Sequence, residues 1–466
     1  MTWRSFLIGL GAVAGLSLLS PYGAWIKNYG WLSTTSFPAG PVLVLVTLTL
    51  FLNLLLRLVR RRWQLSRAEL MVVWCMAIVG VTIPADGIGR FWYAAVAGGP
   101  YLARRPDLYW EEGGSLTHAP PGLVLSRNEY SKAAEQYFEG APETGRVPWT
   151  AWLRPLLWWS VFIIVLYLAV FFLTAILRRQ WVERERLIFP LARVPLDFTE
   201  GSAGERLLPR IFYERSFLLG LLVVAGYRLA SALPLLFGAE SAWTPTFPFA
   251  DAFQGTPLEH AGFANVDLWP LAVGFAFLVP ADVSLSVWFF FLFSRVQILI
   301  ARSLALPEGA GTWAPLMSWQ QAGAYIAFAL GALFMARRHL LAVVRRAIGM
   351  RNAPDDSGEP VGYPLAFWGF LLAIAGCLAW YWYHGMKLLS AAAALALLFC
   401  WFLAYARMVA QGGMYVGRTI WSLDALIQGV SRGSALTPAG AVICRMQTYM
   451  LVRGGTVMLA PMAVNA

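Results

Sequence analysis

Charged residues are scarce in this chain. Only 13% of its 466 residues are charged and 59% are hydrophobic, with a mean hydropathy of +0.60. Soluble domains carry roughly 25% charged residues, so the composition excludes an ordinary soluble domain. Runs such as 41–56 and 155–177 approach or exceed the roughly 20 apolar residues that a spanning helix needs. We therefore predict an all-α, polytopic transmembrane helical bundle that lies in the lipid bilayer.

Cysteine and histidine are also rare. The four cysteines stand singly in apolar runs, which excludes a disulfide framework and a cysteine metal site. The four histidines are far apart and lack metal-ligand spacing, and no glycine-rich phosphate loop follows a strand pattern. We therefore expect no metal, no cofactor and no catalytic residue. The isolated residues are Cys75, Cys377, Cys400, Cys444, His118, His260, His339 and His384.

Basic residues are unevenly distributed along the chain. Residues 239–268 contain no Lys or Arg, whereas 57–67, 178–186 and 337–351 are dense in Arg. Because loops that stay in the cytoplasm carry the excess of Lys and Arg, these three segments are expected to face the cytoplasm. The net charge of +11 is explained in this way, without a nucleic-acid partner. We predict a multi-pass protein of the bacterial cytoplasmic (inner) membrane with a cytoplasmic N-terminus.

The orientation constrains the number of crossings. Residues 269–302 must cross an even number of times or not at all, because 337–351 would otherwise lie outside. Thirty-four residues are too few for two spans, so a re-entrant hairpin is predicted; one kinked helix is the alternative. The expected divisions are 1–98, a loop at 99–151, 152–336 with the hairpin, a cytoplasmic loop at 337–362, and 363–466. About nine full spans are expected: 5–20, 38–57, 69–85, 152–177, 216–237, 320–336, 363–383, 388–406 and 438–461.

The tip of this hairpin carries polar residues. Pro280 interrupts the apolar run, and Asp282, Ser284 and Ser286 follow it. An ionisable side chain inside a membrane is costly and is usually functional. Asp282 is predicted to bind a cation, a proton or a substrate amine, and the hydroxyls to add ligands or to close freed backbone groups. Alternatively, Asp282 caps the helix that begins near Val283.

A second copy of this signature occurs earlier in the chain. The stretch TIPADGIGRFWYAA (82–95) aligns with LVPADVSLSVWFFF (278–291), so that Asp86 stands opposite Asp282. Paired, proline-interrupted apolar segments in two parts of a chain point to a transporter's binding site. Asp86 is thus a second candidate. Alternatively, the match is a coincidence and Asp86 simply caps the outer end of its helix.

Two further segments are candidates. At 405–427 a span ends in Gln411-Gly412-Gly413, and adjacent glycines permit unusual dihedral angles and close backbone approach. We interpret Gln411 as a binding residue and Arg407 as an anchor to phosphate headgroups. The segment 183–197 is amphipathic and twice interrupted by Pro. It is expected to form an interfacial helix, a gate or a plain surface loop.

Together these segments resemble the oligopeptide transporter superfamily, and more closely an uncharacterised bacterial polytopic family distantly related to it. The shared motifs are Glu185-Arg186-Leu187 with Phe189-Pro190-Leu191-Ala192, then Pro280, Asp282, Ser284, Ser286 and Trp288-Phe289-Phe290, then Arg407 with Ala410-Gln411-Gly412-Gly413. The resemblance covers about residues 20 to 430. It implies a secondary transporter of peptides or metal chelates, driven by protons. The superfamily proper has more spans than are expected here.

Two other functions remain open. In the first, the protein is an extracytoplasmic-facing enzyme on a lipid-linked substrate, with Glu111 and Glu112 of the external loop as its acidic residues. In the second, it is a non-transporting subunit of a membrane complex or a homo-oligomer. The transporter interpretation requires a small-molecule or peptide substrate.

Overall fold

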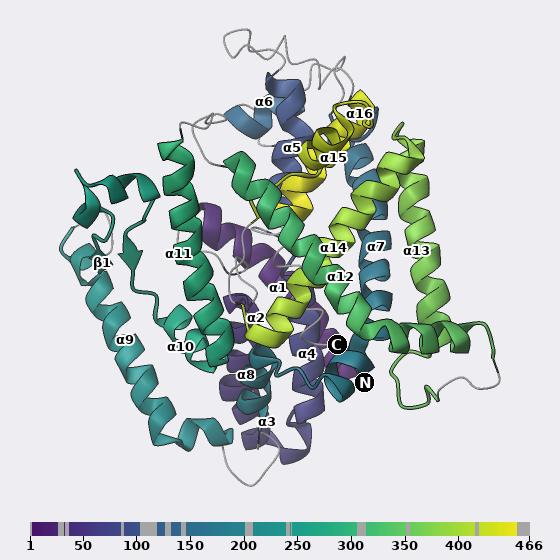
Figure 1. Cartoon of the computed structure of the whole chain (residues 1–466). Helices are drawn as coiled ribbons and strands as arrows, with labels where there is room; N and C mark the ends of the chain where they lie inside the picture. Colours follow the sequence, from purple (N-terminus) through teal and green to yellow (C-terminus); the bar gives the residue numbers. More distant parts are fainter. Residues whose placement is uncertain are drawn as a thin grey trace.

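The computed structural model describes residues 2–26, 32, 37–84, 88–102, 119–125, 132–140, 146–200, 208–238, 243, 245–304, 314–350, 355–414 and 419–453. Almost all regular structure in these residues is helical (Figure 1), which confirms the all-α prediction. Eight helices are long and apolar enough to cross a membrane, so the chain is a multi-pass membrane protein. They are Trp3–Ile26, Ala39–Val59, Trp149–Arg184, Arg215–Leu236, Ala281–Ser303, Met317–Ala347, Tyr363–Tyr383 and Leu388–Gly412.

The expected nine spans differ from these eight helices at three places. The predicted span 69–85 is a helix of only 14 residues. In the region predicted to span 438–461, helical residues run from Pro438 through the end of η12 (Thr448–Arg453), and 454–461 lie outside the described residues. By contrast, Ala281–Ser303 is a continuous helix of 23 residues. It is longer than the return arm of a short hairpin requires, because no helix breaker interrupts the run after Asp282.

Residues 3–80, from α1 to α4, form a group of helices in the middle and lower part of the molecule in Figure 1. The turn before α4 is fixed by two local devices. Asn53 exchanges two hydrogen bonds with the backbone of Leu65, and Ser66 forms a capping box with Glu69 that starts α4. The elements are α1 (Trp3–Pro21), η1 (Tyr22–Ile26), α2 (Ala39–Thr47), η2 (Leu48–Leu52), α3 (Asn53–Val59), η3 (Arg61–Trp63) and α4 (Arg67–Gly80).

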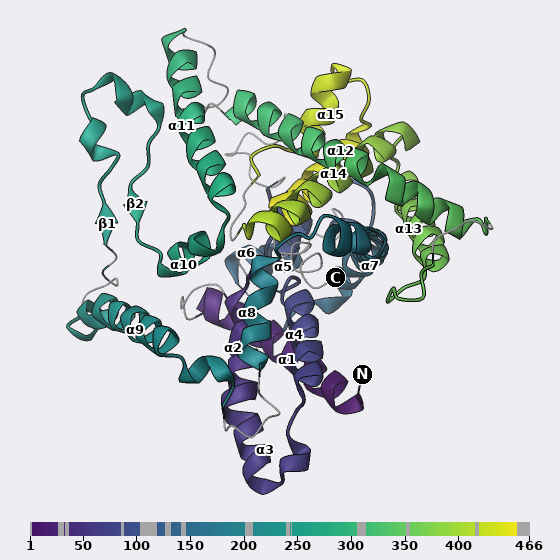
Figure 2. The same ribbon diagram turned by 60° about the horizontal axis from the view of Figure 1, so that its bottom comes forward.

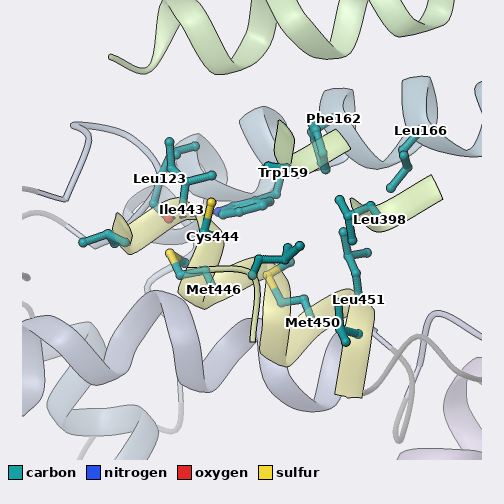
Figure 3. Close-up of a cluster of buried hydrophobic side chains, with 14 of the residues drawn as sticks. Leu123, Trp159, Phe162, Leu166, Leu398, Ile443, Cys444, Met446, Met450 and Leu451 are labelled. Atoms are coloured by element: carbon teal, nitrogen blue, oxygen red, sulfur yellow. Dashed lines mark hydrogen bonds between the residues drawn. The ribbon is translucent and has the colours of Figure 1, made fainter. Parts of the chain in front are cut away.

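The core of the bundle is centred on α14 (Leu388–Gly412), the candidate span with the largest buried share. It packs against α12 (Ala314–Ala347) and α13 (Tyr363–Tyr383), and its buried side chains share hydrophobic clusters with α7 (Trp149–Arg179, extended by η7, Gln180–Arg184). Figure 3 shows the buried side chains where these helices meet the C-terminal segment. The Trp159 indole N–H donates to the carbonyl of Leu123, 3.1 Å away, which ties a loop to this core.

Shorter helices close the upper end of the core in Figure 1. They follow the break after α4 or follow α14, and α5 packs against η12. The buried Tyr381 hydroxyl donates to Gln447 at 2.7 Å and joins α13 to this group. These elements are α5 (Ile88–Leu102), α6 (Lys132–Glu139), α15 (Leu423–Ser431), α16 (Pro438–Gln447) and η12 (Thr448–Arg453).

Residues 215–303 form a separate arm at the left of Figures 1 and 2. None of the most apolar window of α11 is buried, and only 6% of that of α9 is. This low burial has a simple reason in the sequence. Aromatic and aliphatic residues surround both helices, and such surfaces suit a membrane or protein environment. The arm contains α9 (Arg215–Leu236), the antiparallel pair β1 (Thr246–Phe247) and β2 (Val266–Asp267), η9 (Asp251–Phe253), η10 (Pro257–Ala261), α10 (Pro270–Leu278) and α11 (Ala281–Ser303).

The arm is connected to the core group by α8 (Pro190–Thr199) and η8 (Arg210–Tyr213). The segment 183–197 therefore includes a helix and is not a plain surface loop. Pro190 is the first residue of α8, where its missing N–H costs no hydrogen bond. Pro195 lies inside α8 and is buried together with Leu191, so one face of this helix packs against the protein.

Candidate functional site

The lower end of α14 is the centre of the candidate site. As predicted, the Gln-Gly-Gly sequence ends the helix, which stops at Gly412. Gly413 has φ +62° and its N–H donates to the carbonyl of Val409 at 2.9 Å. This left-handed cap favours glycine, because a Cβ would be strained there. Gln411 is half-buried and is the penultimate residue of the helix.

The segment between α7 and α8 binds this helix end. The Phe189 N–H donates to the carbonyl of Ala410 at 2.9 Å. A Cβ on Gly413 would lie 3.1 Å from Cβ of Pro190, so the two backbones approach closely. Phe189 has φ +47° and Arg186 has φ +51°. Bulky residues in this region carry strain, which proteins retain mainly at functional sites.

A buried ion pair connects the same two elements. Arg407 Nη2 lies 2.5 Å from Glu185 Oε2, and the side chains are only 8% and 11% exposed. Gln180 Nε2 donates to the other Glu185 carboxylate oxygen at 2.8 Å. The interpretation of Arg407 as a headgroup anchor was therefore wrong, because its guanidinium is directed to a protein carboxylate inside the fold. Sequence alone indicated neither the partner nor the burial.

The tip between α10 and α11 is the third element at this place. Val279 and Pro280 have extended backbone, with ψ of 134° and 143°, so α10 and α11 are separate helices and not one kinked helix. The chain reverses there, close to the predicted turn at Ala281-Asp282 (Figure 1). A Cβ on Gly412 would lie 3.1 Å from Cγ1 of Val283. Whether this reversal lies within a membrane stays a prediction.

The three motifs are therefore brought together in space. Figures 1 and 2 both place the start of α8, the α10–α11 tip and the lower end of α14 side by side. We call this place the junction and define it by residues 185–190, 279–284 and 407–413. It combines a buried ion pair, two strained residues, a broken helix end and a helix start. Backbone groups at such helix ends are available to bind ligands.

The polar residues of the tip have different environments. Asp282 is exposed and is the second residue of α11, so the expectation that it caps a helix starting at Val283 was wrong. The cap position is Pro280, which has no side-chain acceptor. Ser286 Oγ donates to the carbonyl of Asp282 at 2.7 Å, as expected of a hydroxyl that satisfies backbone. Ser284 is exposed, and its N–H donates to the Pro280 carbonyl at 3.0 Å.

The earlier Pro-Ala-Asp copy also stands at a helix break. α4 ends at Gly80 and α5 begins at Ile88, whereas Asp86 itself lies outside the described residues. Thr82, next to the break, shares a 2.8 Å hydrogen bond with the Tyr167 hydroxyl. The two copies differ in direction, since α5 continues upward beyond α4 while α11 runs back from α10 (Figure 1).

The remaining sequence candidates do not add to the junction. Glu111 and Glu112 lie outside the described residues. In the part of the chain that is described, no group of three His, Cys, Asp or Glu side chains is arranged to hold a metal ion.

Comparison with known proteins gives one match. Residues 1–466 match the model of a family of unknown function (DUF6785), and the chain belongs to this family. The comparisons with curated proteins and with solved structures gave no match.

Proposed function

We propose that this protein is a secondary transporter of peptides or small chelates, coupled to protons, in the bacterial cytoplasmic membrane. Its N-terminus faces the cytoplasm in this proposal. The observation that carries it is the packing of Val283 and Pro190 on the two adjacent glycines that end α14. Broken helices that meet at one point are the usual architecture of a transporter's substrate site.

The junction has suitable chemistry for a cationic group. Asp282 precedes Val283, which packs on Gly412, so it belongs to the tip that contacts the broken end of α14. An exposed carboxylate on this tip can accept a proton or the ammonium of a substrate. The side-chain amide of Gln411 can both donate and accept hydrogen bonds, and Gln411 is the residue before Gly412, which contacts Val283. In the proposal these two side chains bind the polar parts of the substrate.

The arm provides an element that can move. α9 and α11 bury few side chains against the rest of the chain, and elements with few buried contacts are those that move at low free-energy cost. A rotation of the arm would lift the α10–α11 tip from Gly412 and open the junction. Such rigid-body movement of one unit against another is a common basis of alternating access.

The test is uptake by the purified full-length protein in proteoliposomes. Radiolabelled trialanine is the probe, a pH gradient drives uptake, and an internal pH dye reports proton entry. We expect Asp282→Asn to abolish peptide-dependent proton entry with insertion unchanged. Asp251→Asn is the matched control, because Asp251 is also an exposed acidic residue of the arm but lies in η9. Equal transport by wild type and Asp282→Asn would contradict the assignment of Asp282 as a binding residue.

A second candidate is a subunit of a larger membrane complex. The observation that favours it is the exposure of large side chains along α11, where Trp288 is 60% and Phe290 is 62% exposed. Large apolar patches of this kind are covered by lipid or by another protein. Mass measurement of the protein extracted from its native membrane distinguishes the two, because only the second candidate requires a stoichiometric partner subunit.

A further inference from the structure

We infer that Arg407 binds the carboxylate of the transported molecule, which makes the substrate a zwitterion such as a short peptide. This inference rests on the proposed function and adds an anion-binding group to it. The first observation is a buried donor. Arg407 Nη1 has no hydrogen-bond partner among the described residues, although the side chain is only 8% exposed.

An unpartnered donor of this kind requires an explanation. The large majority of buried side-chain polar atoms in proteins are paired, and leaving a charged donor unpaired is costly. The contact between the two side chains joins Glu185 Oε2 to the other terminal nitrogen, Nη2. The guanidinium therefore keeps one N–H edge for an acceptor, and a carboxylate is the acceptor that its planar geometry fits best.

The position of Arg407 connects this donor to the rest of the junction. Gln411 follows it by four residues and thus lies on the same face of α14, one turn closer to the helix end. Gly412, the next residue, is in contact with the tip that carries Asp282. A guanidinium on α14 and a carboxylate on α11 therefore belong to two helices that meet at Gly412. This arrangement matches a molecule with a carboxylate at one end and an ammonium at the other.

Glu185 gives the site its specificity. Buried ion pairs add little net stability, because desolvation offsets the attraction, so stability alone does not explain why this pair is kept. Here the Glu185 carboxylate holds Arg407 in place, and Gln180 holds Glu185 at 2.8 Å. Because Glu185 already balances the arginine's charge, an uncompensated anion is less favoured than a zwitterion whose ammonium is paired by Asp282. The backbone is strained at Arg186 and Phe189, next to Glu185, and proteins keep such strain mainly at functional sites.

The experiment measures binding to the intact protein in detergent by thermal stabilisation. The probes are trialanine and trialanine amide, which differ only in the C-terminal carboxylate. We expect trialanine to raise the apparent Tm of the wild type and the amide to bind at least about tenfold more weakly, as the loss of a charge-assisted hydrogen bond requires. This comparison needs no variant, so a folding defect cannot obscure it.

Two variants complete the test. Arg407→Lys keeps the charge but removes the forked geometry, and we expect its affinity for trialanine to fall about tenfold. Arg445→Gln is the control, because Arg445 is also paired with a buried carboxylate, that of Asp424, but at the other end of the bundle. Equal binding of peptide and amide, no binding of either, or full affinity in Arg407→Lys would overturn the inference. Carboxylate-dependent binding without any uptake would overturn the proposed transport and leave only the assignment of Arg407 as a carboxylate-binding residue.

Discussion

A Cβ atom added to Gly412 would lie 3.1 Å from Cγ1 of Val283, a residue of the α10–α11 tip. The end of α14 and the start of α11 are thus in direct contact, although they are remote in sequence. This contact and the neighbouring Glu185–Arg407 pair define the junction. A Cβ at position 412 would require Val283 to move by a few tenths of an ångström.

Gly412→Val is expected to displace the tip. The larger side chain overpacks the contact with Val283 at a cost of about 1–3 kcal/mol, which changes the population of the packed tip by about 5- to 150-fold. Trialanine uptake in proteoliposomes should fall accordingly. Gly226→Val is the control, since Gly226 lies in α9 with no atom within 4 Å of its added Cβ. Uptake reduced equally in both variants would contradict the prediction.

Gly413→Ala is expected to lower stability through strain and contact together. A non-glycine residue at φ +62° costs about 1–2 kcal/mol, and the added Cβ is 3.1 Å from Pro190. Gly349→Ala separates the two effects, because Gly349 has φ +74° but no atom within 4 Å. We expect the apparent Tm to fall further in Gly413→Ala. Identical losses would show that Pro190 does not restrict this position.

Removing one partner of the buried ion pair is expected to be costly. Glu185→Gln leaves the Arg407 charge buried without compensation, which costs about 3–5 kcal/mol in comparable pairs. The exposed pair of Arg210 and Glu214 provides the comparison, since its side chains are 67% and 51% exposed and Glu214→Gln should cost less than about 1 kcal/mol. Thermal unfolding in detergent measures both. A small effect of Glu185→Gln would mean that the pair is open to water.

Asp356 is expected to make stability depend on pH in the acid range. Burial alone would raise the pKa of its carboxyl, but the Tyr363 N–H at 2.8 Å and the Arg346 guanidinium hold that pKa below its ordinary value. The lowered pKa means that the stabilisation is complete above about pH 4 and is lost as the pH falls through the folded-state pKa. Asp356→Asn should therefore lower the apparent Tm at pH 7, by the equivalent of about 1–3 kcal/mol.

The difference between Asp356→Asn and wild type should then narrow below about pH 4, because the wild-type carboxyl becomes protonated as well. The measurement is a set of unfolding curves between pH 3 and pH 7. This range starts about one unit below the ordinary pKa of an aspartate. A gap that stays constant over this range would show that the interaction does not depend on the charge of Asp356.

Much of the fold follows from local sequence. Apolar runs such as that of α7 predict their helices, Pro280 predicts the break at the tip, and Gln411-Gly412-Gly413 predicts the end of α14. Each of these depends on residues close together in the chain. Ser66 and Glu69 likewise determine the start of α4 through a capping box.

The contacts of the junction were beyond sequence reasoning. Glu185 and Arg407 pair only because α7 and α14 pack in one orientation, and an arginine at the end of an apolar helix is equally compatible with a headgroup contact. The bounds of α11 are close to those of the predicted return arm of the hairpin. The crossing count treated 269–302 as one hairpin, and its return arm is a helix that extends to Ser303 and is long enough to cross a membrane.

The most direct test of the transport account is a disulfide across the junction. Val283→Cys and Gly412→Cys are introduced together into a chain without its four native cysteines. An added Cβ at position 412 lies 3.1 Å from Cγ1 of Val283, and this atom is bonded to the Val283 Cβ. The two Cβ atoms are therefore close enough for a disulfide, which requires a separation of about 3.5–4.5 Å. The account predicts that oxidation closes the bond, stops trialanine uptake, and that reduction restores it. A closed disulfide that leaves uptake unchanged would contradict the claim that the tip must leave Gly412 during transport.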